Sequence, residues 1–317
     1  MIDQTAFIHY GSICFSFAIP GLGVALGQGI VTQSIIQAIN RQPALRDTFS
    51  RFFFIAIALT ETASVLSALI GITIFMNGVP SFEGALIELG IALGMGIPAG
   101  AIGILSARPT FQAFQSIARQ PQLGQKILNL LLISQSIIQT PVIFALVVGW
   151  ILNQYVDTPV TTIEALKLCS AGLTLALGSI GSIIGLTSFA SEACRGCGQN
   201  SHAYPHLLSF SFLSQAVIET PVLFSLVTAL LMIFAPIPTT QASILGIGYI
   251  CAAFASGMSS TSTGISSGHT AQSAAATIAI YPQEYATISR ISILGQTLID
   301  TTAIYGLIIA VLIIFSL

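Results

Sequence analysis

The stretch FFFIAIALTETASVLSALIGITIF, residues 52–75, places one carboxylate, Glu61, in the middle of an apolar run long enough to cross a bilayer. A polar residue followed by Thr recurs in three more apolar runs, at a spacing of about eighty residues. These pairs are Gln139–Thr140, Glu219–Thr220 and Asp300–Thr301. An ionisable side chain at this depth costs about 3 kcal/mol or more and marks an ion pathway. Four tandem copies therefore predict the repeated part of a membrane ion-translocating protein.

The composition agrees with a chain that lies almost entirely in the membrane. Of the 317 residues 54% are hydrophobic and 6% are charged, against about 25% charged residues in soluble domains. The mean hydropathy is +0.90. The sequence has no convincing nucleophile, base or metal cluster, so we expect no catalytic residues, no cofactor, no resident metal and no nucleic-acid partner.

Polar breaks divide the chain into eight predicted helices, at about 5–39, 45–77, 83–117, 122–153, 161–194, 205–235, 241–279 and 283–316. Paired, they predict an all-α membrane protein of four tandem hairpins, with repeats at 1–79, 80–157, 158–238 and 239–317. Eight of the nine Lys and Arg residues lie at or near the turns inside the hairpins. Because positive charge favours the cytoplasmic side, we expect these turns to be cytoplasmic and both termini to lie outside.

The first helix of each hairpin carries small residues at alternate positions when the four polar–Thr pairs are aligned. The clearest runs are Gly21, Gly23, Ala25, Gly27 and Gly29 in the first hairpin and Ser260, Ser262, Gly264, Ser266 and Gly268 in the fourth. Small residues let helix backbones approach closely where lipid supplies no hydrophobic drive. The pattern predicts that these four helices pack tightly into an inner ring.

Together these residues resemble the c subunit, the proteolipid of the rotor ring in F-type rotary ATP synthases. The resemblance rests on the glycine-rich helix 21–29, the turn Arg41-Gln42-Pro43, and Glu61. The turn recurs as Arg119-Gln120-Pro121, and the segment from Gly295 and Gln296 through Asp300, Thr301 and Tyr305 is similar to the carboxylate helix of that family. Four fused hairpins depart from the single hairpin that is usual there, and the third and fourth turns diverge.

The resemblance implies a c-ring made of several copies of this chain, together with lipids, a stator protein that supplies an essential Arg, and a central stalk. Arg41, Gln42, Pro43, Arg119, Gln120 and Pro121 would dock that stalk. The transported ion would be H⁺ or Na⁺. We expect a bacterial inner membrane, because the Arg-Gln-Pro turns suit it and because the segment before Tyr10 has no Lys or Arg, so that we expect no cleaved signal.

Three of the four pairs carry a carboxylate that can hold an ion, namely Glu61, Glu219 and Asp300. The candidate ligands are Gln28, Thr62, Gln139, Thr220, Ser267, Gln296, Thr301 and Tyr305. Gln139 cannot titrate, so its hairpin is either a spacer or supplies an amide ligand to a neighbouring site. Leu186 stands at the Gln28 position of the third hairpin, which argues against a full sodium cage and favours protons.

Two other function classes remain open on the sequence. A vacuolar-type ATPase proteolipid would share the hairpins, but the Arg-Gln-Pro turns favour the ATP synthase type. A self-contained secondary transporter would usually have inverted repeats, whereas each hairpin here has its turn on the same side. Cys194, Cys197, His202 and His206 resemble a metal or redox spacing, although the interval is short for a zinc site, and we expect no metal there.

Overall fold

The computed structural model describes residues 4–236 and 244–316, which form long helices joined by short turns. Within those two ranges no residue lies in a β-strand. The helices are α1 (Gln4–Arg41), α2 (Arg46–Met76), α3 (Phe82–Leu105), α4 (Ala107–Arg119), α5 (Gly124–Ile138), α6 (Thr140–Asn153), α7 (Thr162–Gln199), α8 (Tyr204–Phe234), α9 (Ile244–Ile280) and α10 (Tyr285–Ser316). The predicted fold class, an all-α protein of many membrane-length helices, is confirmed. The predicted boundary between the third and fourth repeats, at 238 and 239, and the predicted helix start at 241 lie outside the described residues.

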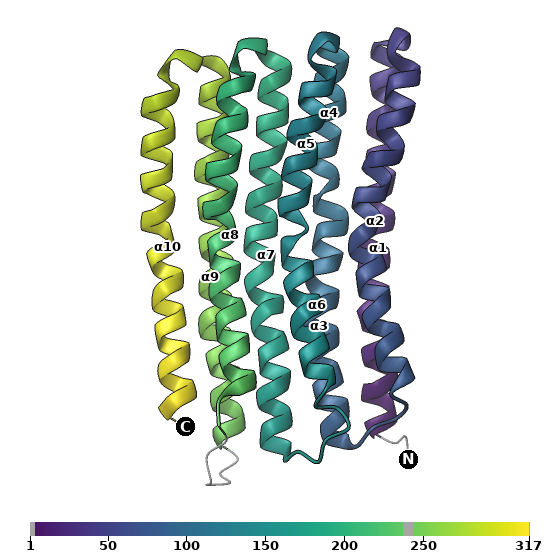
Figure 1. Ribbon diagram of the computed structural model, residues 1–317, viewed down its shortest axis with the longest axis vertical. Helices are drawn as coiled ribbons and strands as arrows, with labels where there is room; N and C mark the ends of the chain where they lie inside the picture. The colour runs from purple at the N-terminus through teal and green to yellow at the C-terminus, as the bar shows by residue number, and fades with distance from the viewer. Residues whose placement is uncertain (1–3, 237–243, 317) are drawn as a thin grey trace.

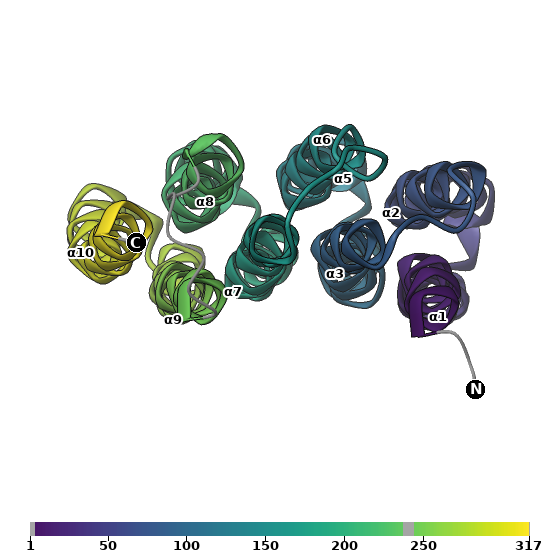
Figure 2. The same cartoon turned by 90° about the horizontal axis from the view of Figure 1, so that it is seen from below.

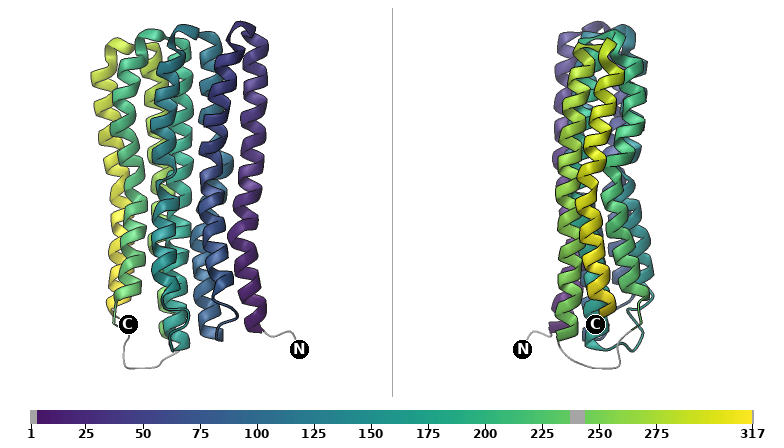
Figure 3. Two further views of the ribbon diagram at one scale, coloured as in Figure 1. Left: turned by 45° about the vertical axis from the view of Figure 1, so that its right-hand side comes forward. Right: turned by 90° about the vertical axis from the view of Figure 1, so that its left-hand side faces the viewer.

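The helices stand side by side in two bowed rows. One row holds α1, α3 with α4, α7 and α9 on the concave side, and the other holds α2, α5 with α6, α8 and α10 on the convex side (Figure 2). The 3₁₀ turns η1 (Pro43–Leu45), η2 (Pro121–Leu123), η3 (Ser201–Ala203) and η4 (Pro282–Glu284) link the two rows. All four turns lie at one end of the molecule, and the ends of α1 and α10 near the termini lie at the other (Figures 1 and 3). The repeated units are therefore parallel, not inverted.

Seven helical stretches in the described residues are long and apolar enough to cross a membrane. Two of them combine shorter helices, α3 with α4 and α5 with α6. The remaining long helix, α9, is rich in Ser and Gly and stands in the concave row beside α7 (Figure 2). Hydroxyls of α9 donate to carbonyls of the same helix, so their protons are bonded without water.

Glycine allows the helices of the concave row to approach one another closely. A Cβ on Gly23 of α1 would fall on the carbonyl oxygen of Gly100 in α3. In the same way, a Cβ on Gly181 of α7 would fall on the carbonyl oxygen of Thr261 in α9, whose hydroxyl donates to Leu177 O at 2.6 Å. These contacts need backbone against backbone, which only residues without a large side chain permit.

The predicted helices at 83–117 and 122–153 are each broken once. α3 ends at Leu105, four residues before Pro109, because proline has no N–H to donate to that carbonyl and its ring clashes with it. α5 ends at Ile138, and Pro141 likewise leaves the Ile137 carbonyl without its helical donor. The Thr140 hydroxyl takes that place, donating to Ile137 O at 2.6 Å.

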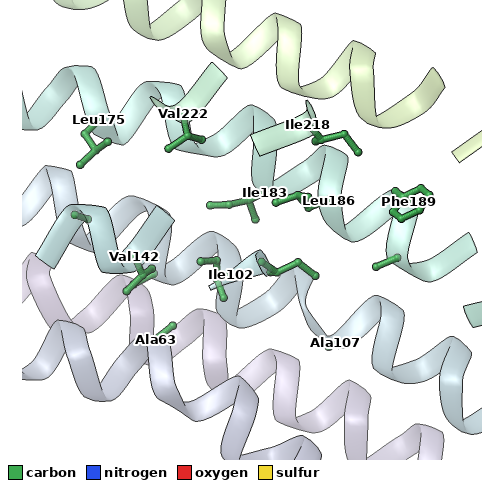
Figure 4. Close-up of a cluster of buried hydrophobic side chains, with 14 of the residues drawn as sticks. Ala63, Ile102, Ala107, Val142, Leu175, Ile183, Leu186, Phe189, Ile218 and Val222 are labelled. Atoms are coloured by element: carbon green, nitrogen blue, oxygen red, sulfur yellow. The ribbon is translucent and has the colours of Figure 1, made fainter. Parts of the chain in front are cut away.

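The two rows enclose a continuous layer of aliphatic and aromatic side chains. Figure 4 shows part of it, with Ile183 and Leu186 of α7 beside Ile218 of α8, and all three are fully buried. This layer fixes how far each convex-row helix is rotated about its axis. It therefore decides which side chains point toward the neighbouring repeat.

Candidate ion-carrier sites

The three carboxylates predicted to carry ions all lie on helices of the convex row, at the same depth. Each lies fifteen residues after the first residue of its helix, on α2 for Glu61, α8 for Glu219 and α10 for Asp300. At a rise of about 1.5 Å per residue this is about 23 Å along the helix, close to its midpoint. Gln139 occupies the corresponding place at the junction of α5 and α6.

The four positions differ in burial according to whether another repeat precedes them. Glu61, in the first repeat, is exposed, whereas Gln139 is 9% exposed, Glu219 is half-buried and Asp300 is 7% exposed. Asp300 Oδ1 is buried and has no hydrogen-bond partner among the described residues. A carboxylate in that setting is stable only when it is neutralised, by a proton or by a bound cation.

Gln139 and Thr140 connect the second repeat to the sites on both of its sides. Gln139 Nε2 donates to the carbonyl oxygen of Leu59, two residues before Glu61 on α2, at 2.9 Å. On the other side, the Thr140 side chain lies beside the Glu219 carboxyl, and its hydroxyl proton is donated to Ile137 O at 2.6 Å. Gln139 Oε1 is buried without a partner in the described part of the chain. An amide oxygen in that position is free to accept from a protonated group or to ligate a cation.

The predicted hydroxyl ligands are turned toward their own helices. Thr62 donates to Leu59 O, Thr220 to Ala216 O and Thr301 to Leu298 O, at 2.7–3.1 Å. Their lone pairs remain available, since each hydroxyl has used only its proton. The structure contains no hydrogen bond between the side chain of Gln28, which is half-buried, and that of Glu61, both of which lie in the described residues. Tyr305 is 64% exposed on α10.

A belt of buried glutamines lies one turn from the carboxylates, on the side of the η turns. Its members are Gln135, Gln215 and Gln296, each four residues before the polar–Thr pair of its repeat and each 0% exposed. Gln215 Nε2 donates to Ser134 Oγ at 3.0 Å, and Ser214 Oγ donates to Gln296 Oε1 at 3.1 Å, so the bonds cross from one repeat to the next. Ser267 also reaches Gln296 Oε1, at 3.4 Å. In the first repeat Ile57 stands at this position, and the belt stops there.

One buried ionisable pair lies outside the predicted sites. His9 Nδ1 on α1 is 2.7 Å from Glu88 Oε2 on α3, and both side chains are almost completely buried. The other carboxylate oxygen, Glu88 Oε1, has no partner among the described residues. The partners are 79 residues apart in sequence, so their pairing was not visible from either apolar run. The pair joins the first and second repeats near the end that holds the termini.

The turns predicted to dock a stalk share one backbone conformation. Gln42 and Gln120 precede their 3₁₀ turns with φ near −140° and −129°, and both adjacent arginines and prolines are exposed. The third turn keeps the same shape with different residues. Asn200 Oδ1 accepts from His202 N at 3.0 Å, and Asn200 Nδ2 donates to Ala279 O of the fourth repeat at 3.0 Å. Exposure of the first two turns leaves them free to bind another protein.

The cysteines at the end of α7 are part of the helix packing. Cys194 and Cys197 are both free thiols that are fully buried. Across the described residues no group of three or more His, Cys, Asp and Glu side chains is arranged to hold a metal ion.

Comparison with known proteins identifies similar sequences in three of the four repeats. The family model for the C subunit of ATP synthase matches residues 12–74, 169–232 and 250–313, which together make up more than half of the chain. The unmatched stretch 75–168, between the first two matched segments, contains both helix breaks and Gln139.

Individual relatives are bacterial proteins that each match about one repeat. The ATP synthase c subunit of Campylobacter jejuni is 33% identical over 73 residues, which cover 23% of this chain and 65% of that protein, slightly less than two thirds of its length. The protein of the same name from Sulfurimonas denitrificans is 32% identical over 79 residues, covering 25% of this chain and 76% of the relative. The ATP synthase c subunit 2 of Cereibacter sphaeroides is 40% identical over 58 residues, covering 18% and 70%.

Proposed function

Because this chain belongs to the c-subunit family of ATP synthases, we propose that several copies of it form the rotor ring of a membrane-embedded ATP synthase. In this proposal the chain is a non-catalytic subunit that couples ion flow to rotation. Glu61, Glu219 and Asp300 carry the ions. The other partners are a stator protein with an essential Arg and a central stalk, which docks on the exposed turns at Arg41 and Arg119. The membrane is a bacterial inner membrane, with the η turns on its cytoplasmic side.

The observation that carries the proposal is the common position of the three carboxylates. Each lies at the midpoint of a convex-row helix, on the side of the rows that would face lipid and stator in a ring. A neutralised carboxyl can pass through hydrocarbon, while a charged one must meet water or a positive partner. This difference allows ions to enter and leave only where the stator offers a path, so that ion passage requires rotation.

The surroundings of the carboxylates support protons over sodium ions. A sodium site needs several oxygen ligands around one cation, but Leu186 of α7 belongs to the apolar layer next to the Glu219 helix. The hydroxyls of Thr62, Thr220 and Thr301 already donate to their own helices. A proton needs only the carboxyl and one acceptor, and the Thr140 hydroxyl beside Glu219 keeps lone pairs for that role because its own proton is donated to Ile137 O.

The second repeat takes part in two sites without titrating. Its Gln139 amide reaches the backbone beside Glu61, and its Thr140 reaches Glu219. We propose that Gln139 Oε1, buried and unpaired among the described residues, accepts a hydrogen bond from the protonated Glu61 of the same chain when a neighbouring copy closes that site. The alternative of a secondary transporter is disfavoured because the repeats are parallel.

Carbodiimide labelling of purified assemblies tests the proposal, since the reagent attacks protonated carboxyls in apolar surroundings. The labelling should be followed by mass spectrometry across pH, with and without sodium. We expect adducts at Glu61, Glu219 and Asp300 that decline as pH rises and do not change with sodium. Glu83, on the exposed end of α3, is the internal control and should not acquire this protected label.

The outcomes separate the parts of the proposal. Adducts at the same three residues that sodium suppresses would replace protons by sodium. Failure of all three residues to label, in assemblies whose folding is verified, would reject their role as carriers. A Glu61→Gln variant that still labels at Glu219 and Asp300 would show that each site titrates on its own.

A further inference from the structure

The double row of helices has two unlike end faces, one formed by α1 and α2 and the other by α9 and α10 (Figure 2). Three seams between repeats lie inside the chain, α1 with α3, α3 with α7 and α7 with α9. We call a position on the first helix of a repeat forward if it faces the following repeat, and backward if it faces the preceding one. Because the repeats are parallel and similar, each seam brings a forward position of one repeat against a backward position of the next. The three internal seams are therefore templates for a fourth seam, between copies.

The middle seam shows one such pair in direct contact. A Cβ on Gly172 of α7 would fall on the carbonyl oxygen of Gly90 in α3. When the four polar–Thr pairs are aligned, the forward position of Gly90 is filled by Ser12 in the first repeat, Ser170 in the third and Cys251 in the fourth. The backward position of Gly172 is filled by Cys14, Ala92 and Ala253 in the first, second and fourth repeats.

Burial of these two positions follows the order of the repeats. The forward position is buried in the first three repeats and exposed only in the last, at Cys251. The backward position is buried in the last three repeats and exposed only in the first, at Cys14. Cys251 is exposed because no following repeat of the same chain covers it, and Cys14 is exposed because no preceding repeat does.

Other positions on the same helices repeat this rule. Gly23 and Gly181 are buried forward residues, and Ser262, which aligns with them in the fourth repeat, is exposed. Gly27 and Gly185 are likewise buried, and Ser266, which aligns with them in the fourth repeat, is exposed. Gly264 and Gly268 are buried backward residues of the fourth repeat, whereas Ala25 and Gly29, which align with them in the first repeat, are exposed. The unpartnered face of α9 therefore offers small polar residues at the level where α1 offers a free glycine and alanine.

We propose that the α9–α10 face of one copy binds the α1–α2 face of the next, in the register that sets Cys251 against Cys14. The inference rests on the ring assembly proposed above and defines its intermolecular seam. The same docking brings Thr301 of one copy to Glu61 of the next, as Thr140 reaches Glu219 inside the chain. It explains why Glu61 is the exposed member of the three carboxylates. The first ion site is incomplete until a second copy binds.

The seam carries a native thiol pair, so it can be tested without adding cysteines. Assemblies in mild detergent would be oxidised with copper(II) phenanthroline, which takes two electrons from two thiols as the S–S bond forms and two protons leave. We expect a ladder of covalent multimers on a non-reducing gel, with a Cys14–Cys251 linkage in its peptides. A short bismaleimide should give the same ladder, since it does not need disulfide geometry.

Two variants borrow the residue that other repeats carry at the same position. Cys14→Ala, as in Ala92 and Ala253, and Cys251→Ser, as in Ser12 and Ser170, should each remove the ladder and leave the assembly mass in native mass spectrometry unchanged. Cys169→Ala should keep the ladder, because Cys169 lies at an internal seam beside Gly90.

The possible failures are distinct. An intact assembly that gives no ladder with either reagent, or that links Cys14 to Cys14, would overturn this register and leave the ring proposal standing. A chain that is monomeric in native mass spectrometry under all solubilisation conditions would instead overturn the ring itself.

Discussion

Removing Glu88 alone should destabilise the protein far more than removing Glu88 together with His9. The Glu88→Leu change leaves the His9 ring buried without its only hydrogen-bond partner in the described structure. The His9 ring cannot turn to another hydrogen-bond partner, because it lies between the packed helices α1 and α3. We therefore expect His9→Leu/Glu88→Leu to be close to the original protein in stability.

The expected magnitude follows from burial and geometry. A hydrogen bond to a charged group is worth about 1.5–3 kcal/mol net, and breaking a buried ion pair from one side costs about 3–5 kcal/mol. Polar contacts between membrane helices often measure less, about 0.6 kcal/mol on average, because the unfolded chain in the membrane finds other partners. The 2.7 Å contact and the side-chain exposures of 2% and 0% favour the upper range here. We expect a loss of about 3 kcal/mol for Glu88→Leu and of less than about 1 kcal/mol for the double variant.

Unfolding in mixed micelles of increasing SDS content measures these losses. Trp150, the one tryptophan of the chain, lines a pocket of about 360 Å³ with Ile70 of α2 and Ile91 of α3, so its fluorescence reports on the packing between the first two repeats. Glu83→Leu, at the exposed start of the same helix, is the matched control and should cost less than about 1 kcal/mol. Equal losses in Glu88→Leu and the double variant, or a single-variant loss within error of the control, would refute the reasoning.

Two further predictions concern packing and turn geometry. Gly181→Ala should destabilise the chain by about 1–3 kcal/mol in the same titration, because its Cβ meets the Thr261 backbone, whereas Gly11→Ala, with open space around it, should not destabilise. Asn200→Ala should cost about 1–2 kcal/mol and speed hydrogen exchange at the third turn, since two hydrogen bonds are lost. Asn200→Asp keeps the acceptor within the turn but not the donor to Ala279, so it should lose about half as much. Equal effects at Gly181 and Gly11, or an unchanged turn in Asn200→Ala, would contradict these assignments.

The fold and the depth of the carboxylates were accessible from sequence because both depend on local features. The position of a carboxylate within its apolar run indicates its depth in the membrane, and the four polar–Thr pairs indicate the repeat. The breaks at Ser106 and Gln139 also follow from local sequence, since Pro109 and Pro141 each free the carbonyl four residues earlier.

Features that depend on contact between repeats could not be read in the same way. Glu88 lies in an apolar run like the predicted carriers, and only the packing of α3 on α1 shows that it meets His9. The glutamine belt gave a visible signal, a Gln four residues before three of the four pairs, but its bonds to Ser134 and Ser214 depend on helix rotation. That rotation is set by the apolar layer between the rows, which sequence periodicity constrains only loosely.

In the proposed ring the three carboxylates would not be equivalent carriers. Asp300 is buried inside the chain, Glu219 is half-buried beside Thr140, and Glu61 is exposed. In the proposed ring a stator would meet these three in fixed order, with Gln139 as an uncharged step between the first and second. Three ions for every four hairpins require each ion to supply about one third more electrochemical work than in a ring of the same size with a carboxylate on every hairpin. A Gln139→Glu variant should lower that requirement, so ATP synthesis in reconstituted vesicles should begin at a smaller imposed proton gradient. An unchanged threshold, in a variant whose new carboxyl at position 139 is labelled by carbodiimide, would mean that the second repeat is bypassed and does not act as a missing carrier.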